Sequence, residues 1–176
     1  MGFHNTYLIK FRHMKNKTFS FTYRELEQED ELRDEDQKLL KLAKNSTKTS
    51  YSPYSGYQVG AALRLHNGEV IQGSNQENAA YPSGLCAERV AAFYASSNYP
   101  GIAFETLAIT ASSDNFEEDN FVTPCGACRQ VLAEYENKAG KPIRIIMQGA
   151  SGNILVVESV THLLPFTFYE SKLQNL

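Results

Sequence analysis

The sequence of 176 residues has no long apolar run and no excess of positive charge. No run approaches the roughly 20 apolar residues of a membrane-spanning helix, and none near the N-terminus forms the apolar core of a signal peptide. The formal net charge of -3 offers no bulk attraction to phosphate backbones or anionic membranes. We therefore expect no nucleic-acid partner and no membrane partner.

Cysteine is also scarce, and its odd count excludes a complete disulfide framework. The three cysteines are Cys86, Cys125 and Cys128. Three thiolates fill three corners of a tetrahedral zinc site and leave the fourth for water, which is the composition of a catalytic site. Their segments, Cys-Ala-Glu-Arg and Pro-Cys-Gly-Ala-Cys, match the zinc-dependent nucleobase deaminase pattern, with Glu88 as the proton carrier. The sequence thus predicts a Zn²⁺ cofactor, and reduced thiols used as ligands indicate the cytoplasm.

Both parts of the cysteine motif are expected to open helices. Cys125 and Cys128 are three positions apart, so in a first helical turn they share one face and reach one ion. The free N–H groups and the positive end of a helix favour thiolates there. Three thiolates around a dication leave one negative charge, and Arg89 and Arg129 are the candidates to compensate it. The alternative for both arginines is a position on the helix surface.

Charge divides the sequence into an N-terminal extension and one domain. Residues 1–35 place basic side chains before a run of acidic ones, a pattern more typical of a solvated appendage than of a core. Residues 36–176 are sufficient for a single catalytic domain with its own core. From Asp36, the run with Leu39, Leu40, Leu42 and Ala43 predicts an amphipathic helix that packs on the domain.

Five strands and two further helices are predicted in this domain. The strands cover residues 59–65, 69–71, 106–111, 143–147 and 154–157, and the helices cover about residues 84–96 and 125–137. The last connection is too short for a parallel crossover, so the last strand should run antiparallel to its predecessor. This order predicts an α/β fold, a three-layer α/β/α domain on a mixed five-stranded sheet.

Further segments accompany the cysteine motifs, in order, between about residues 39 and 168. They are Ser52–Ser55, Val59–Leu63, Asn75–Pro82 and Leu163–Phe168. Together these segments resemble cytidine deaminases of the small, three-cysteine, homotetrameric kind. The resemblance implies a cytidine deaminase-like fold, a homotetramer, and zinc-dependent hydrolytic deamination of free cytidine and deoxycytidine to uridine and deoxyuridine in pyrimidine salvage, with release of ammonia.

The resemblance also implies substrate contacts. Asn75 and Glu77 match residues that hydrogen-bond the ribose 3′-hydroxyl, and Ala87 matches a backbone N–H that contacts the pyrimidine O2. Tyr57 matches an aromatic residue that stacks on the base, although the family usually has Phe there. Phe168 matches a C-terminal aromatic residue that enters the neighbouring subunit's site. The alternatives for these positions are ordinary turn, strand-start, core and interface positions.

For the metal, the resemblance implies that Cys86, Cys125 and Cys128 are the zinc ligands and that Arg89 hydrogen-bonds the ligand sulfurs. Zinc lowers the pKa of its water from about 15.7 toward 7. Glu88 takes that proton and delivers one to pyrimidine N3, hydroxide adds at C4, and ammonia leaves.

Three other functions compete with this interpretation. A structural zinc domain needs a fourth protein ligand, and no plausible Cys or His lies near the motifs. A polynucleotide-editing deaminase needs a basic strand path, which this acidic chain lacks. A deaminase of aminated nucleoside analogues such as blasticidin S shares the fold and the zinc motif, so it stays open. The preference between cytidine and deoxycytidine, the effect of Tyr57 and the role of residues 1–35 stay open as well.

Overall fold

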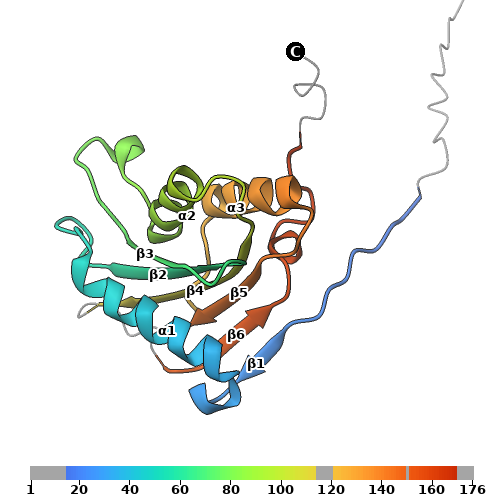
Figure 1. Cartoon of the computed structure of the whole chain (residues 1–176), viewed down its shortest axis with the longest axis horizontal. Coiled ribbons are helices and arrows are strands. Elements are labelled where there is room, and N and C mark those ends of the chain that lie inside the picture. Colours follow the sequence, from blue (N-terminus) through green and yellow to red (C-terminus); the bar gives the residue numbers. More distant parts are fainter. Residues whose placement is uncertain (1–14, 114–120, 150, 170–176) are drawn as a thin grey trace, which may run out of the picture.

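One mixed β-sheet organises the computed structural model, which describes residues 15–113, 121–149 and 151–169. Across these residues the sheet has the strand order β1-β6-β5-β4-β2-β3 (Figure 1). The strands are β1 (Arg24–Leu26), β2 (Gln58–Leu65), β3 (Val70–Ser74), β4 (Phe104–Ser112), β5 (Arg144–Gln148) and β6 (Ile154–Val157). β4 and β5 are parallel, and the other neighbouring strands are antiparallel. The antiparallel direction predicted for the last strand is therefore confirmed.

Helices cover both faces of this sheet. They are α1 (Asp34–Ser46), α2 (Ala87–Asn98) and α3 (Gly126–Ala139), with short 3₁₀ helices η1 (Glu29–Glu31), η2 (Thr47–Thr49), η3 (Tyr81–Ser83) and η4 (Val160–Leu163). α1 lies on one face, and α2 and α3 lie on the other (Figure 1). Alternate residues of β2 follow this division, because Ala61 and Leu63 join the core under α2 and α3 whereas Ala62 joins the core under α1. The predicted three-layer α/β/α fold is confirmed. Within the described residues, no helix is both long and apolar enough to cross a membrane.

At two strand glycines, helix backbone atoms leave no room for a Cβ atom. A Cβ atom on Gly60 would lie 2.1 Å from the carbonyl oxygen of Ala43 in α1. A Cβ atom on Gly73 would lie 2.5 Å from the carbonyl oxygen of Ala87 in α2. Only a residue without a side chain allows backbones to come this close. Gly73 therefore sets the position of the first turn of α2 against the sheet.

The predicted five-stranded sheet is wrong in its strand count, because the N-terminal extension supplies a sixth strand. β1 pairs antiparallel with β6, with Arg24 opposite Val156 and Leu26 opposite Ile154. Leu32, between β1 and α1, is 4% exposed and belongs to the core under α1. The interpretation as a solvated appendage is therefore wrong for residues 24–32, since Leu26 lies in a paired strand and Leu32 is buried. Residues 1–14 of the extension lie outside the described residues, and its division from the domain at residue 35 stays a prediction.

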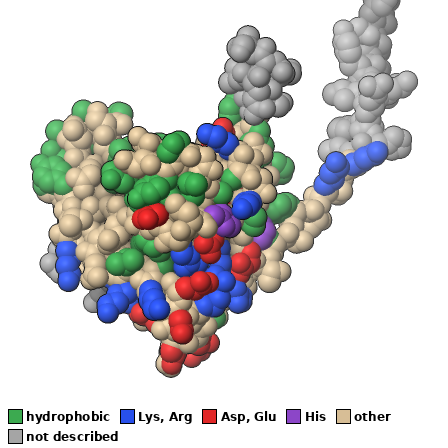
Figure 2. Space-filling view, viewed as in Figure 1, with side chains coloured by type: hydrophobic (Ala, Val, Ile, Leu, Met, Phe, Trp, Pro, Cys, Tyr) green, Lys and Arg blue, Asp and Glu red, His purple; other side chains and the backbone are tan. Residues whose placement is uncertain are grey.

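The acidic run also contains one carboxylate that holds the layers together. Asp36 is 0% exposed, and it accepts hydrogen bonds from Arg33 at 2.9 Å, from Arg64 of β2 at 3.2 Å, and from Arg144 of β5. Burial by itself would raise the pKa of Asp36, but the hydrogen bond from Arg33 and the charges of Arg144 and Arg33 outweigh it, so the pKa is lowered. The acidic side chains of η1 and the start of α1, in contrast, gather at one tip of the surface (Figure 2).

Candidate active site

The three cysteine sulfurs converge where the N-termini of α2 and α3 meet. Cys86 is the N-cap residue of α2, Cys125 is the N-cap residue of α3, and Cys128 lies buried in the first turn of α3. The Sγ atoms of Cys86 and Cys125 are 3.7 Å apart, those of Cys125 and Cys128 are 3.5 Å apart, and all three lie within 4.8 Å of one another. A tetrahedral zinc ion with Zn–S bonds of 2.3 Å places its sulfurs about 3.8 Å apart. The donor set therefore fits zinc.

No fourth His, Cys, Asp or Glu donor joins this cluster among the residues that the structure describes. Zinc sites with three protein ligands keep one position for water or substrate, whereas structural sites are closed by a fourth ligand. The arrangement therefore suits a catalytic rather than a structural metal.

One arginine contacts the cysteine sulfurs. Arg89, one turn after Cys86, places its Nη2 atom 3.6 Å from the Cys86 Sγ atom. The pKa of Cys86 is lowered by the hydrogen bond from Cys128 and, less strongly, by Arg89, although burial acts in the opposite direction. Arg129 is turned elsewhere: its Nε donates to the carbonyl oxygen of Pro124 at 2.8 Å. Of the two candidate arginines, the geometry brings Arg89 to the sulfurs and Arg129 to the backbone.

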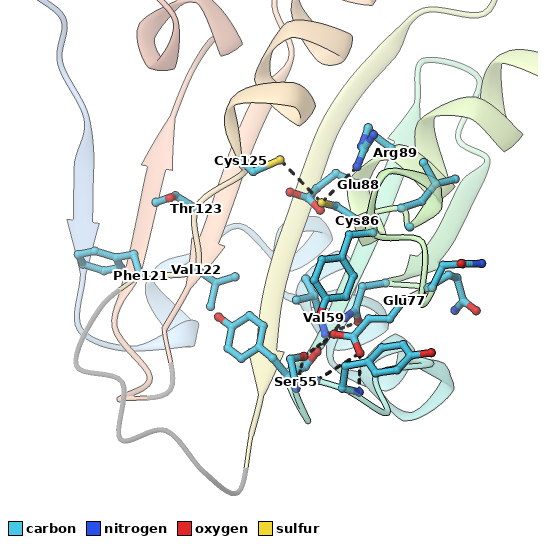
Figure 3. A pocket seen from close by; sticks show the side chains of 18 residues that line it. Ser55, Val59, Glu77, Cys86, Glu88, Arg89, Phe121, Val122, Thr123 and Cys125 are labelled. Carbon is cyan, nitrogen blue, oxygen red and sulfur yellow. Dashed lines mark hydrogen bonds between the residues drawn. The ribbon is translucent and has the colours of Figure 1, made fainter.

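Glu88 lies in the first turn of α2 and is 4% exposed. Burial is the main cause that raises the pKa of Glu88 to about 7, and the nearby Cys86 adds to the effect. A carboxyl group with a pKa near neutrality both accepts and releases protons at physiological pH. Figure 3 shows its carboxyl group close to Cys86 and Cys125, at the wall of a cavity.

This cavity has a volume of about 810 Å³, within the range of about 300–1,000 Å³ typical of small-molecule sites. Cys86, Cys125 and Glu88 line one end of it, and Glu77 with Ser55 lines the other (Figure 3). The cavity thus places a candidate metal centre and a separate polar group within the reach of one small molecule.

The polar end is built by Asn75 and Glu77, which follow β3. The Asn75 Oδ1 atom accepts from the Val59 N–H at 2.8 Å, and its Nδ2 atom donates to the Tyr57 carbonyl oxygen at 2.8 Å. Asn75 therefore holds the start of β2, and its amide nitrogen retains a second N–H. Glu77 accepts from the Tyr54 N–H at 2.9 Å and from the Ser55 hydroxyl, and these contacts lower the pKa of its carboxyl group.

The other three predicted substrate contacts lie at different distances from the cavity. Tyr57 is half-buried and lines it. Ala87 is the first residue of α2, is fully buried, and does not line it. Phe168 also does not line it, and its side chain is 66% exposed. This chain's own fold therefore brings Tyr57 to the site but leaves Phe168 outside.

Some cavity residues had no role in the sequence analysis. Tyr54 and Tyr81 form an edge-to-face pair at the cavity, with ring centroids 6.4 Å apart. Phe121, Val122 and Thr123 line the wall opposite Glu77 (Figure 3). Their position directly before the Pro-Cys-Gly-Ala-Cys segment is a sequence feature that predicts a place in the cavity wall, because residues next to a metal ligand lie near the metal.

Comparison with known proteins agrees with this geometry. Residues 33–140 match the family model for the cytidine and deoxycytidylate deaminase zinc-binding region. The chain is 38% identical over 138 residues to a cytidine deaminase of Sporosarcina psychrophila, covering 78% of this chain and 93% of that protein. It is 39% identical over 132 residues to a cytidine deaminase of Halalkalibacterium halodurans, covering 75% of this chain and 92% of that protein. The crystal structure of cytidine deaminase from Burkholderia pseudomallei is similar, with a TM-score of 0.65 at 35% identity, covering 78% of this chain and 100% of that one. The chain therefore belongs to the cytidine deaminase family.

Proposed function

We propose that this protein catalyses the zinc-dependent hydrolytic deamination of free cytidine and deoxycytidine, giving uridine or deoxyuridine and ammonia, as in pyrimidine salvage. The observation that carries the proposal is the position of Glu88, a buried carboxyl group with a pKa of about 7 beside three cysteine sulfurs on a nucleoside-sized cavity. A purely structural metal site has no use for such a group.

Cys86, Cys125 and Cys128 would hold the zinc ion. When bound, zinc would act as a Lewis acid that lowers the pKa of a water molecule toward about 7. Glu88 carries the protons of the reaction. It accepts one proton from the water and donates it to pyrimidine N3, so that C4 becomes electrophilic and the water oxygen bonds to C4. It then moves the second proton from that oxygen to the amino group, and the C4–N bond breaks as ammonia leaves.

The polar end of the cavity would bind the sugar. The ionised Glu77 is a hydrogen-bond acceptor, and the remaining N–H of Asn75 is a donor, a combination that suits the hydroxyl groups of a free ribose. Tyr57 would offer an aromatic face to the base. Ala87 is the first residue of α2, so its backbone N–H has no partner inside the helix and would donate to the pyrimidine O2. Binding of the sugar, far from C4, would fix the position of C4 relative to the metal site and Glu88.

We further propose a homotetramer in the cytoplasm, in which Phe168 of one subunit enters the site of a neighbour. Large hydrophobic side chains support this assembly, since Tyr81 is 78% exposed, Tyr94 is 57% exposed and Phe166 is 95% exposed. Hydrophobic side chains also gather over α2 and the loop before it (Figure 2). Exposed apolar patches of this kind mark protein–protein contacts.

A substrate panel on purified, zinc-loaded protein tests the proposal. Ammonia release would be followed with cytidine, deoxycytidine, CMP, adenosine, blasticidin S and a short cytosine-containing oligonucleotide. The two free nucleosides should give the highest kcat/KM, because the Asn75 and Glu77 end of the cavity suits an unmodified ribose. A preference of about tenfold or more for blasticidin S or for the oligonucleotide, roughly 1.4 kcal/mol in transition-state binding, would overturn it.

A further inference from the structure

The segment after η4 is held in place by two side chains of the metal-binding helix. Phe166 is 95% exposed and Phe168 is 66% exposed, so their rings contribute little burial that could hold this segment against the domain. An exposed segment without packing opens readily unless hydrogen bonds hold it. Two residues that follow Cys128 supply such bonds: Arg129 bonds Leu163, the last residue of η4, and Gln130 bonds Phe168 within the segment.

Arg129 connects the ligand turn with the end of η4. Its Nε atom donates to the carbonyl oxygen of Pro124 at 2.8 Å, and its Nη1 atom donates to the carbonyl oxygen of Leu163 at 2.9 Å. Pro124 directly precedes the ligand Cys125. One planar guanidinium group therefore sets the distance between the backbone entering the metal site and the backbone leaving η4.

Gln130 bonds the chain at Phe168, five residues after the Arg129 contact at Leu163. Its Nε2 atom donates to the Phe168 carbonyl oxygen at 2.9 Å, and its Oε1 atom accepts from the Phe168 N–H at 3.3 Å. The two bonds bind both polar backbone groups of one residue, so they fix the orientation of its backbone as well as its position. The backbone of Phe168 is therefore held against α3 while its side chain is 66% exposed.

We propose that Arg129 and Gln130 are positioning residues that couple the metal-ligand turn to the C-terminal segment Leu164–Tyr169, so that an ion held by Cys125 and Cys128 also holds Phe168 in place. The inference rests on the zinc site of the proposed function. Its physical basis is that Arg129 and Gln130 directly follow Cys128 in the first turns of α3. When the bound ion orders this turn, both side chains are held where they can form their hydrogen bonds. Loss of the ion loosens the turn and with it the segment.

Hydrogen exchange of backbone amides measures this coupling without any substrate. In the zinc-loaded wild type, removal of zinc with a chelator should speed exchange at Phe168 by about tenfold, as expected for the loss of a local hydrogen-bond pair. Gln130→Ala should speed it by a similar factor in the zinc-loaded protein, with the zinc content unchanged. Asn137→Ala is the matched control, because it removes an exposed amide side chain from the same helix. Unchanged exchange in the β4 and β5 amides shows that each variant is folded.

Arg129→Lys separates coupling from a merely structural role. Lysine keeps the charge but lacks the fork that spans two carbonyl groups, so zinc should leave faster to a competing chelator. Gln130 still bonds Phe168 in this variant, so zinc removal should change exchange at Phe168 less than in the wild type, in which both residues link the two segments. The proposal is overturned if exchange at Phe168 is the same with and without zinc in the wild type, or if Arg129→Lys retains the full zinc dependence. A protein that shows the coupling but does not release ammonia from cytidine refutes the proposed function alone.

Discussion

Replacing Gly73 by alanine should displace α2, the helix that carries Glu88. The added Cβ atom would lie 2.5 Å from the Ala87 carbonyl oxygen and 2.8 Å from the Ala91 backbone nitrogen. Both are helix backbone atoms, so no side chain can move aside. Because ordinary contacts between carbon atoms are about 3.5–4.0 Å, β3 and α2 would have to separate by roughly 1 Å. The first turn of α2, with Cys86 and Glu88, would move with it.

The expected loss is moderate in stability and larger in activity. Overpacking of a close backbone contact lowers the free energy of unfolding by about 1–3 kcal/mol. A displacement of about 1 Å at a reacting group can reduce turnover about 100-fold. Urea unfolding would measure the first effect, and ammonia release from cytidine, with the zinc content determined in parallel, would measure the second.

Gly126→Ala is the stability control for this variant. A Cβ atom on Gly126 would meet no atom within 4 Å, and the residue is the first in α3. Alanine is favoured over glycine in helices by up to about 1 kcal/mol, so this variant should be as stable as the wild type or slightly more stable. If Gly73→Ala unfolds at the wild-type urea concentration and retains wild-type turnover, the reasoning from the close contact is refuted.

Three further predictions concern the proposed proton carrier Glu88, the buried carboxylate Asp36 and the C-terminal segment. Glu88→Gln should keep the zinc and the fold but lower turnover at least about 100-fold, as measured by metal analysis alongside kinetics. Asp36→Asn should lower the free energy of unfolding by about 3 kcal/mol, because Arg64 and Arg144 lose their buried partner. Folding lowers the pKa of Asp36, so the ionised carboxylate stabilises the folded state fully above the ordinary Asp pKa of about 4. This stabilisation is lost as the pH falls through the pKa of the folded state. Acid should therefore lower the urea midpoint of the wild type more than that of Asp36→Asn. Ending the chain before Phe166 should raise KM for cytidine or abolish activity without removing zinc, and light scattering of the full-length protein should give the mass of a tetramer.

Each of these predictions can fail in a distinct way. Loss of zinc or near-normal turnover in Glu88→Gln would contradict its role as the proton carrier. Wild-type stability of Asp36→Asn at neutral pH would show that the arginines do not depend on this carboxylate. A fully active sample with the mass of a single chain would contradict the shared active site.

The sequence by itself determined the chemistry of the site. The spacing of Cys125 and Cys128 and the position of Glu88 two residues after Cys86 are local features, and a helical turn converts such spacings directly into geometry. The strands at 59–65 and 154–157 and the layer order follow similarly from apolar patterns over a few residues. The strand predicted at 69–71 ended too early, because the segment from Gln72 to Ser74 pairs with β2 without an apolar pattern.

Only the tertiary structure decided which polar residues build the domain. Asp36 resembles its acidic neighbours in sequence, but it is buried between α1 and the sheet. There it bonds Arg144 of β5, a residue 108 positions away in the chain. The short segment Arg24–Leu26 becomes a strand because the edge of β6 offers it backbone partners. Gln130 bonds Phe168 because α3 and the segment Leu164–Tyr169 meet in space. A local pattern records how a residue relates to its neighbours in the chain, whereas burial, edge pairing and these contacts depend on partners that come together only when the chain folds.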